Sequence, residues 1–191
     1  MVDTKMTKSA GEHWVCSVLS RLDWGVALTR DGLERTDILA VKTDASRRMI
    51  EVQVKSARDD GDRTNWPLGE KSQDWSRSDR EWFVFVTVPT KVPGEPRAYV
   101  IPRDHVSAAA WITYHHWRFD PAIPSGQRNT PRSGTRVHEW TWKGYENRWD
   151  LLDADASEAP ILLPSDLRDQ CLEPYVGLPP GHPWEGALPR W

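Results

Sequence analysis

An alternation of apolar and polar residues in the stretch MIEVQVK, residues 49–55, constrains the fold of this chain more than any other feature. Side chains in a β-strand point alternately to its two faces, so this stretch predicts a strand with one apolar and one polar face. The polar face carries Glu51, Gln53 and Lys55. An antiparallel strand with one solvent-exposed face has the same pattern, so the strand alone leaves the role of these three residues open.

Periodicity and apolar runs place further elements around this strand. Apolar residues at helical spacing predict a first helix over 9–22, and short apolar runs predict the remaining strands. The expected elements are strands 25–29, 37–42, 49–55, 81–88 and 97–102, a helix over 103–117, a short helix within 146–152, and a long polar loop over 57–80. The second and third strands are expected to pair as an antiparallel hairpin. This order of elements indicates a layered α/β domain.

The acidic residues of the chain are concentrated toward its C-terminal end. The net charge is −3, which argues against a general binder of polyanions, and residues 151–191 contain two basic and seven acidic residues. Residues 118–148 contain six basic and three acidic residues, which makes them a candidate basic patch. From residue 159 onward, seven of 33 residues are proline, a composition that favours extended or irregular chain. We therefore predict a domain over 1–158 and an acidic, proline-rich extension over 159–191.

The extension also carries large apolar residues, although it is too polar to form a core of its own. These residues are Leu162, Leu163, Tyr175, Trp184 and Trp191. We expect them to pack along the body of the protein or against a partner. A disordered extension is the alternative.

No feature of the sequence indicates a membrane or an export route. No run of about 18 apolar residues is present, and residues 1–14 lack the apolar core of a secretion signal. The two cysteines, Cys16 and Cys171, match no zinc-binding spacing. We expect a cytoplasmic protein without membrane contact.

Two acidic residues stand at positions that bring them toward the polar face of the strand. Asp37 opens a strand whose other members are mostly apolar. Glu12 lies three residues before Val15 and seven before Leu19, so it shares their face of the first helix and points toward the sheet. The sequence thus predicts that carboxylates from the helix and the second strand lie near the polar residues of the third.

Each of these positions also has a purely structural explanation. Ser9 and Glu12 have the spacing of a capping box at a helix N-terminus. Asp37 stands where a turn residue would be expected, and Lys55 beside Glu51 is typical of a surface pair that contributes well under 1 kcal/mol. These explanations stay open alongside a functional one.

Together the polar residues resemble the motif of the PD-(D/E)XK nuclease superfamily. The core of that superfamily is a helix, a three-stranded antiparallel meander, further strands and a helix. Its motif has an Asp at the start of the second strand and (Asp/Glu)-x-Lys on the third. Asp37 takes the place of the Asp, Gln53-Val54-Lys55 that of the triplet, and Glu12 that of the first-helix acid of Holliday-junction-resolvase-like members. The resemblance covers residues 9 to about 118.

One residue departs from the usual motif. Gln53 stands where most members have an acid, as in some Mrr-like restriction endonucleases. Glu51, two residues away on the same strand face, would supply the missing negative charge.

The resemblance implies a restriction-endonuclease-like α/β fold and a metal-dependent endonuclease that hydrolyses phosphodiester bonds of DNA. A divalent cation such as Mg²⁺ or Mn²⁺ offsets charge on the phosphate and acidifies a bound water, and Mg²⁺ prefers oxygen ligands. The implied metal ligands are Asp37, Gln53, Glu51 and Glu12. The implied role of Lys55 is to orient the attacking water or to stabilise the developing charge. The expected partners are DNA and, for so small a domain, a second copy of the chain or other subunits.

Two other functions stay open. The Gln53 substitution and the weak basic balance are also typical of a catalytically inactive nuclease-fold domain that binds nucleic acid or a protein partner. The proline-rich extension is typical of a structural or interaction module. Two tryptophans of the loop over 57–80, Trp66 and Trp75, either stack on unpaired bases or anchor the loop to the body.

Overall fold

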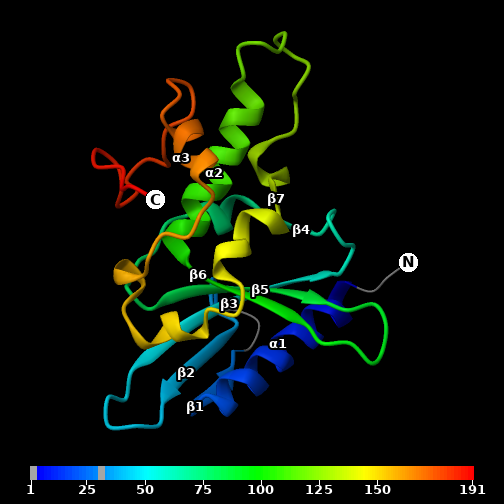
Figure 1. The fold of residues 1–191 in the computed structure, drawn as a ribbon, viewed down its shortest axis with the longest axis vertical. Coiled ribbons are helices and arrows are strands. Elements are labelled where there is room, and N and C mark those ends of the chain that lie inside the picture. Colours follow the sequence, from blue (N-terminus) through cyan, green and yellow to red (C-terminus); the bar gives the residue numbers. More distant parts are fainter. Residues whose placement is uncertain (1–3, 30–32) are drawn as a thin grey trace.

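The computed structural model describes residues 4–29 and 33–191, in which helices pack against a five-stranded β-sheet (Figure 1). Its helices are α1 (Thr4–Arg21), α2 (Arg103–Phe119) and α3 (Ser165–Cys171). Its strands are β1 (Trp24–Leu28), β2 (Ile38–Lys42), β3 (Met49–Arg58), β4 (Asn65–Pro67), β5 (Glu81–Val88), β6 (Arg97–Pro102) and β7 (Arg136–His138). Short 3₁₀ helices are η1 (Glu70–Gln73), η2 (Arg132–Gly134), η3 (Glu139–Tyr145), η4 (Trp149–Asp153) and η5 (Ala156–Glu158).

A five-stranded, mostly antiparallel sheet forms the centre of the domain. Its strand order is β1-β2-β3-β5-β6. The first three strands form the predicted antiparallel meander, with Ile38 opposite Val52, while β5 runs parallel to β3 and pairs antiparallel with β6. The predicted fold class, a helix and an antiparallel meander followed by further strands and a helix, is confirmed.

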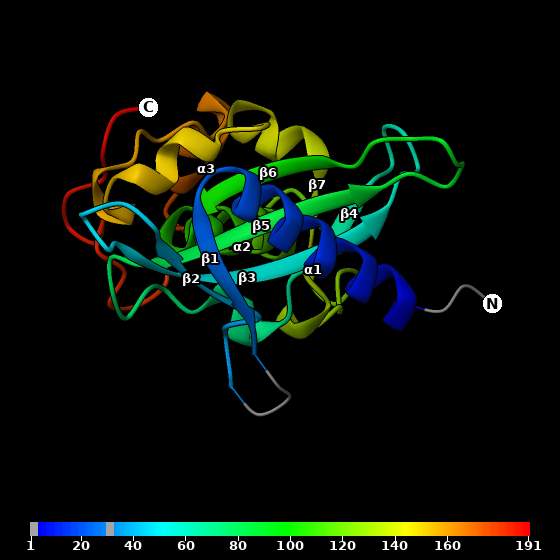
Figure 2. The same cartoon turned by 90° about the horizontal axis from the view of Figure 1, so that it is seen from below.

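The helix α1 covers one face of the sheet and α2 lies on the other side (Figure 2). The residues that α1 buries recur every four positions, as helical periodicity requires: Thr7, Gly11, Val15 and Leu19. At Gly11 the helix touches β3 so closely that a Cβ atom there would lie 1.9 Å from the Ser56 hydroxyl oxygen. This contact fixes the N-terminal half of α1 against β3.

The opposite face of the sheet buries a cluster of aromatic side chains. Trp66 stacks on Phe85 with 5.2 Å between ring centroids, and Trp142 packs edge-on against Phe85 at 5.1 Å. Trp66 is fully buried and Trp75 donates a hydrogen bond to the Pro180 carbonyl oxygen. Both tryptophans therefore anchor their loop, and Trp66 is not available to stack on a base.

The structure corrects several element boundaries. The first helix begins at Thr4 rather than at residue 9, so Ser9 lies in the helix interior and the capping-box explanation of Glu12 is wrong. The stretch 57–80 is not wholly loop, because it contains β4 and η1, and β4 pairs with β7. Strand β3 continues three residues beyond its predicted end at residue 55. The short helix expected within 146–152 is a 3₁₀ helix, η4.

The C-terminal extension lies against α2 and contains a short helix that its proline content did not predict. Its buried side chains include Leu163, Leu167, Cys171, Val176 and His182. Trp111 on α2 donates a hydrogen bond of 3.0 Å to the Val176 carbonyl oxygen, and His182 contacts the Asp104 carbonyl oxygen at 3.0 Å. Within the described part of the chain, no helix is both long and apolar enough to cross a membrane.

A buried histidine joins α2 to the start of the extension. The Nδ1 atom of His105 lies 2.7 Å from the Tyr145 hydroxyl, which accepts a hydrogen bond of 2.8 Å from the Leu162 amide. Burial and, to a smaller extent, the neighbouring His182 lower the pKa of His105 to about 3. The imidazole is therefore neutral in the folded protein at neutral pH.

We expect the protein to lose stability on acidification between about pH 6.5 and pH 3. In this window the unfolded chain protonates His105 near its ordinary pKa of about 6.5, while the folded chain does not. The unfolded state thus binds more protons, and the free energy of unfolding falls as pH falls, by up to about 1.4 kcal/mol per pH unit for one histidine. Urea unfolding at pH 7, 6 and 5 measures this slope. His105→Gln should remove the contribution of about one proton to this slope. An unchanged slope would contradict the conclusion that His105 is neutral in the folded protein.

Candidate active site

Asp37 lies at the start of β2, where the backbone of β3 holds its carboxylate. The Asp37 amide donates to the Val52 carbonyl oxygen at 2.9 Å, which continues the β2–β3 ladder by one residue. Beyond this point β3 has no β2 partner, and the Asp37 Oδ2 atom accepts a hydrogen bond of 2.8 Å from the Val54 amide. The second carboxylate oxygen, Oδ1, is turned toward α1, because it lies 3.7 Å from Lys8 Nζ.

Glu12 approaches the same place from α1. Its Oε1 atom lies 3.3 Å from Lys8 Nζ, the same ammonium that contacts Asp37. The Glu12 side chain is 16% exposed and that of Lys8 is 56% exposed. Two carboxylates from separate elements therefore converge on one cation that reaches them from the solvent side.

Lys55 lies beside this pair on the polar face of β3. It is partly buried, and burial lowers the pKa of its ammonium, while the Asp37 carboxylate raises it and the positive charges of Arg103 and Lys8 lower it. Among residues 4–29 and 33–191, no carboxylate is close enough to Lys55 Nζ to form an ion pair. Lys55 is thus a desolvated cation next to a carboxylate, an environment typical of functional sites.

Gln53 has a different partner from the one its place in the motif implies. Its Oε1 atom accepts a hydrogen bond of 2.8 Å from Arg103 Nη2. Arg103 is almost fully buried, and burial together with the nearby Arg35 lowers its pKa to about 10. The amide oxygen of Gln53 therefore satisfies a buried guanidinium.

The guanidinium of Arg103 belongs to a buried ionic cluster on this face of the sheet. Its Nε atom lies 2.7 Å from Glu81 Oε2, and Arg35 Nη2 donates to the same oxygen at 2.8 Å. Glu81 Oε1 accepts a further hydrogen bond of 2.7 Å from the Arg77 amide. Two arginines thus share the Glu81 carboxylate, and Arg35 Nη1 also lies 3.8 Å from Asp74 Oδ2.

Glu51 is held separately. Its Oε2 atom accepts a hydrogen bond of 3.1 Å from the Thr36 hydroxyl, next to Asp37 in the chain. In the sheet Glu51 lies opposite Leu39 on one side and Glu81 on the other. Within residues 4–29 and 33–191, no three acidic, histidine or cysteine side chains form a group that could hold a metal ion. The structure therefore brings Asp37 and Glu12 together and gives Glu51 and Gln53 other partners.

Three members of this site were not indicated by the sequence pattern: Lys8, Glu81 and Arg103. Lys8 stands four residues before Glu12, a spacing at which helix side chains meet, and this signal was available once the helix was extended to Thr4. Glu81 and Arg103 flank the apolar strands β5 and β6. A charged residue at the end of a buried strand is the signal that could have identified them.

The buried cluster predicts how substitutions of Gln53 affect stability. Gln53→Leu should lower the free energy of unfolding by about 1–3 kcal/mol, because it removes the shortest hydrogen bond of Arg103 Nη2 and leaves that buried group only the longer contact to the Arg35 carbonyl oxygen. Gln53→Glu should not lower it, because a carboxylate at this position keeps an acceptor for Arg103 Nη2 and forms an ion pair with it. Urea unfolding of both variants, with the exposed Gln127→Leu as control, measures the difference. Equal losses in the two Gln53 variants would contradict this assignment.

Comparison with known proteins identifies no family for this chain. No protein-family model and no curated protein sequence matches it. One solved structure that it resembles is a bacterial homing endonuclease, I-Ssp6803I, with 17% sequence identity and a TM-score of 0.46. The match covers 82% of this chain and 96% of that one. Because so low a TM-score supports no transfer of residues or activity, the functional assignment depends on this chain's own side chains.

Proposed function

We propose that this protein is a metal-dependent endonuclease that hydrolyses phosphodiester bonds of DNA. The observation that supports this most is the convergence of the Asp37 and Glu12 carboxylates on a single ammonium, with the partly buried Lys55 beside them. Carboxylates that meet at one point and a neighbouring desolvated lysine are the residue types that phosphodiester hydrolysis requires.

The residues present fit a hard divalent cation at this point. Asp37 Oδ1 and Glu12 Oε1 face the position that Lys8 Nζ now occupies, and Mg²⁺ is commonly bound by one or two carboxylates with waters and phosphate oxygens completing its shell. Lys8 would swing outward, since its side chain is more than half exposed. When bound, Mg²⁺ or Mn²⁺ would acidify a water molecule and offset charge on the phosphate.

The protein's own side chains have separate tasks in this proposal. The Val54 amide holds one Asp37 oxygen, so that the other keeps its direction. Lys55 donates hydrogen bonds to the attacking water or the phosphate, and its lowered pKa makes its ammonium a better proton donor than that of an exposed lysine. Gln53 positions Arg103 rather than binding the metal. Glu51 accepts a hydrogen bond from Thr36, the residue before Asp37, and adds negative charge near the proposed metal site.

Nicking of supercoiled plasmid DNA tests the proposal. The wild-type protein should convert supercoiled plasmid to the open-circular form with Mg²⁺ or Mn²⁺, and EDTA should stop the reaction. Isothermal titration with Mn²⁺ in the absence of DNA should show binding. If the protein neither binds metal nor nicks DNA, it is instead a nuclease-fold domain in which Lys8 permanently neutralises Asp37 and Glu12.

A further inference from the structure

The second half of α2 and the chain that follows it form a basic arm at one end of the molecule (Figure 1). We define the arm as residues 113–138. It contains four arginines and one aspartate, and no lysine or glutamate. Since the protein as a whole carries a net charge of −3, this positive segment is a local feature that contrasts with the rest of the surface.

Most of the arginines in the arm have no acidic partner. Arg128 lies 3.8 Å from the carboxylate of Asp120. For Arg118, Arg132 and Arg136, no carboxylate of the described chain lies within ion-pair distance. Arg136 is exposed and donates a hydrogen bond of 2.9 Å to the Asn65 side chain, a neutral partner. The arm therefore presents positive charge that is available to an anion.

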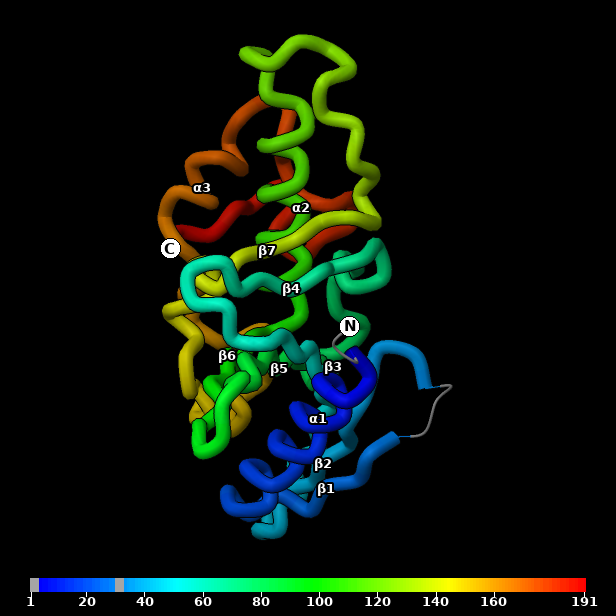
Figure 3. The backbone as a smooth tube through the Cα atoms, turned by 90° about the vertical axis from the view of Figure 1, so that its right-hand side faces the viewer, coloured from blue at the N-terminus to red at the C-terminus, as the bar shows by residue number. Residues whose placement is uncertain are grey.

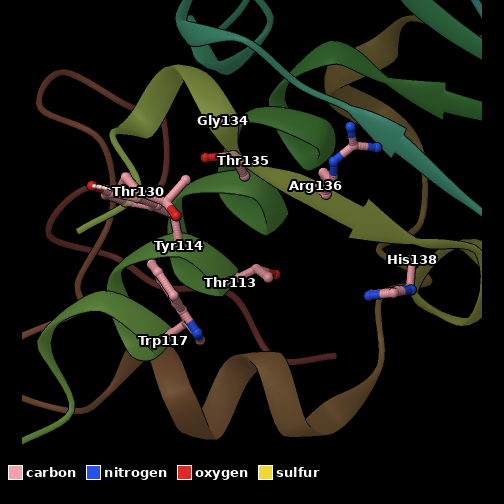
Figure 4. A pocket seen from close by; sticks show the side chains of 8 residues that line it. All are labelled: Thr113, Tyr114, Trp117, Thr130, Gly134, Thr135, Arg136 and His138. Atoms are coloured by element: carbon pink, nitrogen blue, oxygen red, sulfur yellow. Dashed lines mark hydrogen bonds between the residues drawn. The ribbon is translucent and has the colours of Figure 1, made fainter. Parts of the chain in front are cut away.

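A pocket of about 280 Å³ opens between α2 and β7 within this arm (Figure 4). Tyr114 and Trp117 line it from α2, and Arg136 and His138 line it from β7. Trp117 is 38% exposed, and the guanidinium of Arg128 lies 5.5 Å above its ring. Aromatic rings, a hydroxyl-bearing wall and an arginine at the rim are the groups that hold an unpaired nucleotide, by stacking and by phosphate contact.

We infer that the arm binds a single-stranded segment of DNA, with one unpaired base in the pocket against Trp117 and Tyr114 and the adjacent phosphates on Arg132 and Arg136. Bases in a duplex are already stacked on each other, so exposed aromatic rings select unpaired ones. The choice of DNA as the polyanion depends on the proposed function, whereas the pocket and its charge do not.

The arm lies where a bound DNA strand would be able to continue to the candidate active site. Figure 3 shows, in succession, the arm, β7, β4 and the N-terminal end of α1. The pairing of β4 with β7 joins these parts into one surface. A strand held by the arm would cross the β4–β7 ribbon on its way to Lys8 and Asp37.

Fluorescence anisotropy with a labelled oligothymidine, in EDTA so that no cutting occurs, tests the inference. The double variant Arg132→Gln/Arg136→Gln should weaken binding about tenfold at 0.1 M salt and reduce the slope of log affinity against log salt by about 1.4, because each phosphate contact on a single strand contributes about 0.7. Arg21→Gln/Arg47→Gln, which removes two exposed arginines outside the arm, is the matched control and should have little effect.

Trp117→Leu tests the pocket itself. It should weaken oligothymidine binding by about fivefold or more without changing the salt slope, because stacking contributes this much per base. Trp140→Leu, which removes an exposed tryptophan outside the arm, should bind like wild type. The inference would be overturned if the arginine double variant or Trp117→Leu bound oligothymidine as tightly as its control. If arm-dependent binding is found and plasmid nicking is absent, the proposed function fails and the inference stands.

Discussion

Asp37→Asn is expected to reduce metal-dependent nicking by at least about 100-fold while leaving thermal stability close to that of the wild type. The amide oxygen of Asn can still accept the hydrogen bond from the Val54 amide, so the β2–β3 edge is retained. The change removes only the negative charge that would hold the metal together with Glu12. Metal-assisted charge stabilisation amounts to several kcal/mol, and each 1.4 kcal/mol corresponds to a factor of ten in rate.

Asp37→Ala is a less informative variant, because it also removes a structural hydrogen bond. It leaves the Val54 amide without its acceptor and should lower the free energy of unfolding by about 1–3 kcal/mol. Asp169→Asn, an exposed aspartate on α3, is the control for loss of a carboxylate. Wild-type nicking by Asp37→Asn would exclude this residue from the active site, and loss of nicking in the Asp169 variant would show that the assay reports general damage.

The elements that could be predicted are those with an uninterrupted local pattern. The alternation of 49–55 and the continuous apolar run of 81–88 correspond to β3 and β5. The ribbon of β4 and β7 could not be predicted, because each strand has three residues and their pairing joins distant parts of the chain. Such short strands are stabilised by burial of Trp66 and Val137 rather than by local propensity.

Only part of the candidate site could be predicted from the sequence, because the rest depends on contacts between distant parts of the chain. Helix and strand periodicity place Glu12 and Asp37 toward the same edge of the sheet. Periodicity does not show which polar groups meet across the sheet, and the hydrogen bond between Arg103 and Gln53 spans 50 positions. The sequence pattern therefore identifies the residues of the polar face but assigns Gln53 a ligand role, whereas the structure shows it bound to a buried arginine.

Removal of the extension by truncation after Ser157 is expected to leave a chain that does not fold cooperatively at 25 °C. Leu163, Leu167 and Val176 are buried, and each such side chain contributes roughly 1.5–3 kcal/mol on burial. Partly buried tryptophans, Trp184 and Trp191, pack against the same core. The combined loss is comparable to the roughly 5–15 kcal/mol that stabilises a typical domain. The predicted division into a domain over 1–158 and a separate extension stays a prediction, and this experiment tests it.

Two leucines, one within α3 and one directly after it, distinguish the loss of buried contacts from the shortening of the chain. Leu167 is 1% exposed and Leu172 is 60% exposed, so Leu167→Ala should cost about 2–5 kcal/mol and Leu172→Ala less than about 0.5 kcal/mol. In a chain of this size the first change corresponds to a fall of roughly 4–20 °C in Tm. Differential scanning calorimetry of the two full-length variants measures both. If Leu167→Ala melts like Leu172→Ala and the truncated chain still unfolds cooperatively, the extension is a separable appendage and the body folds without it.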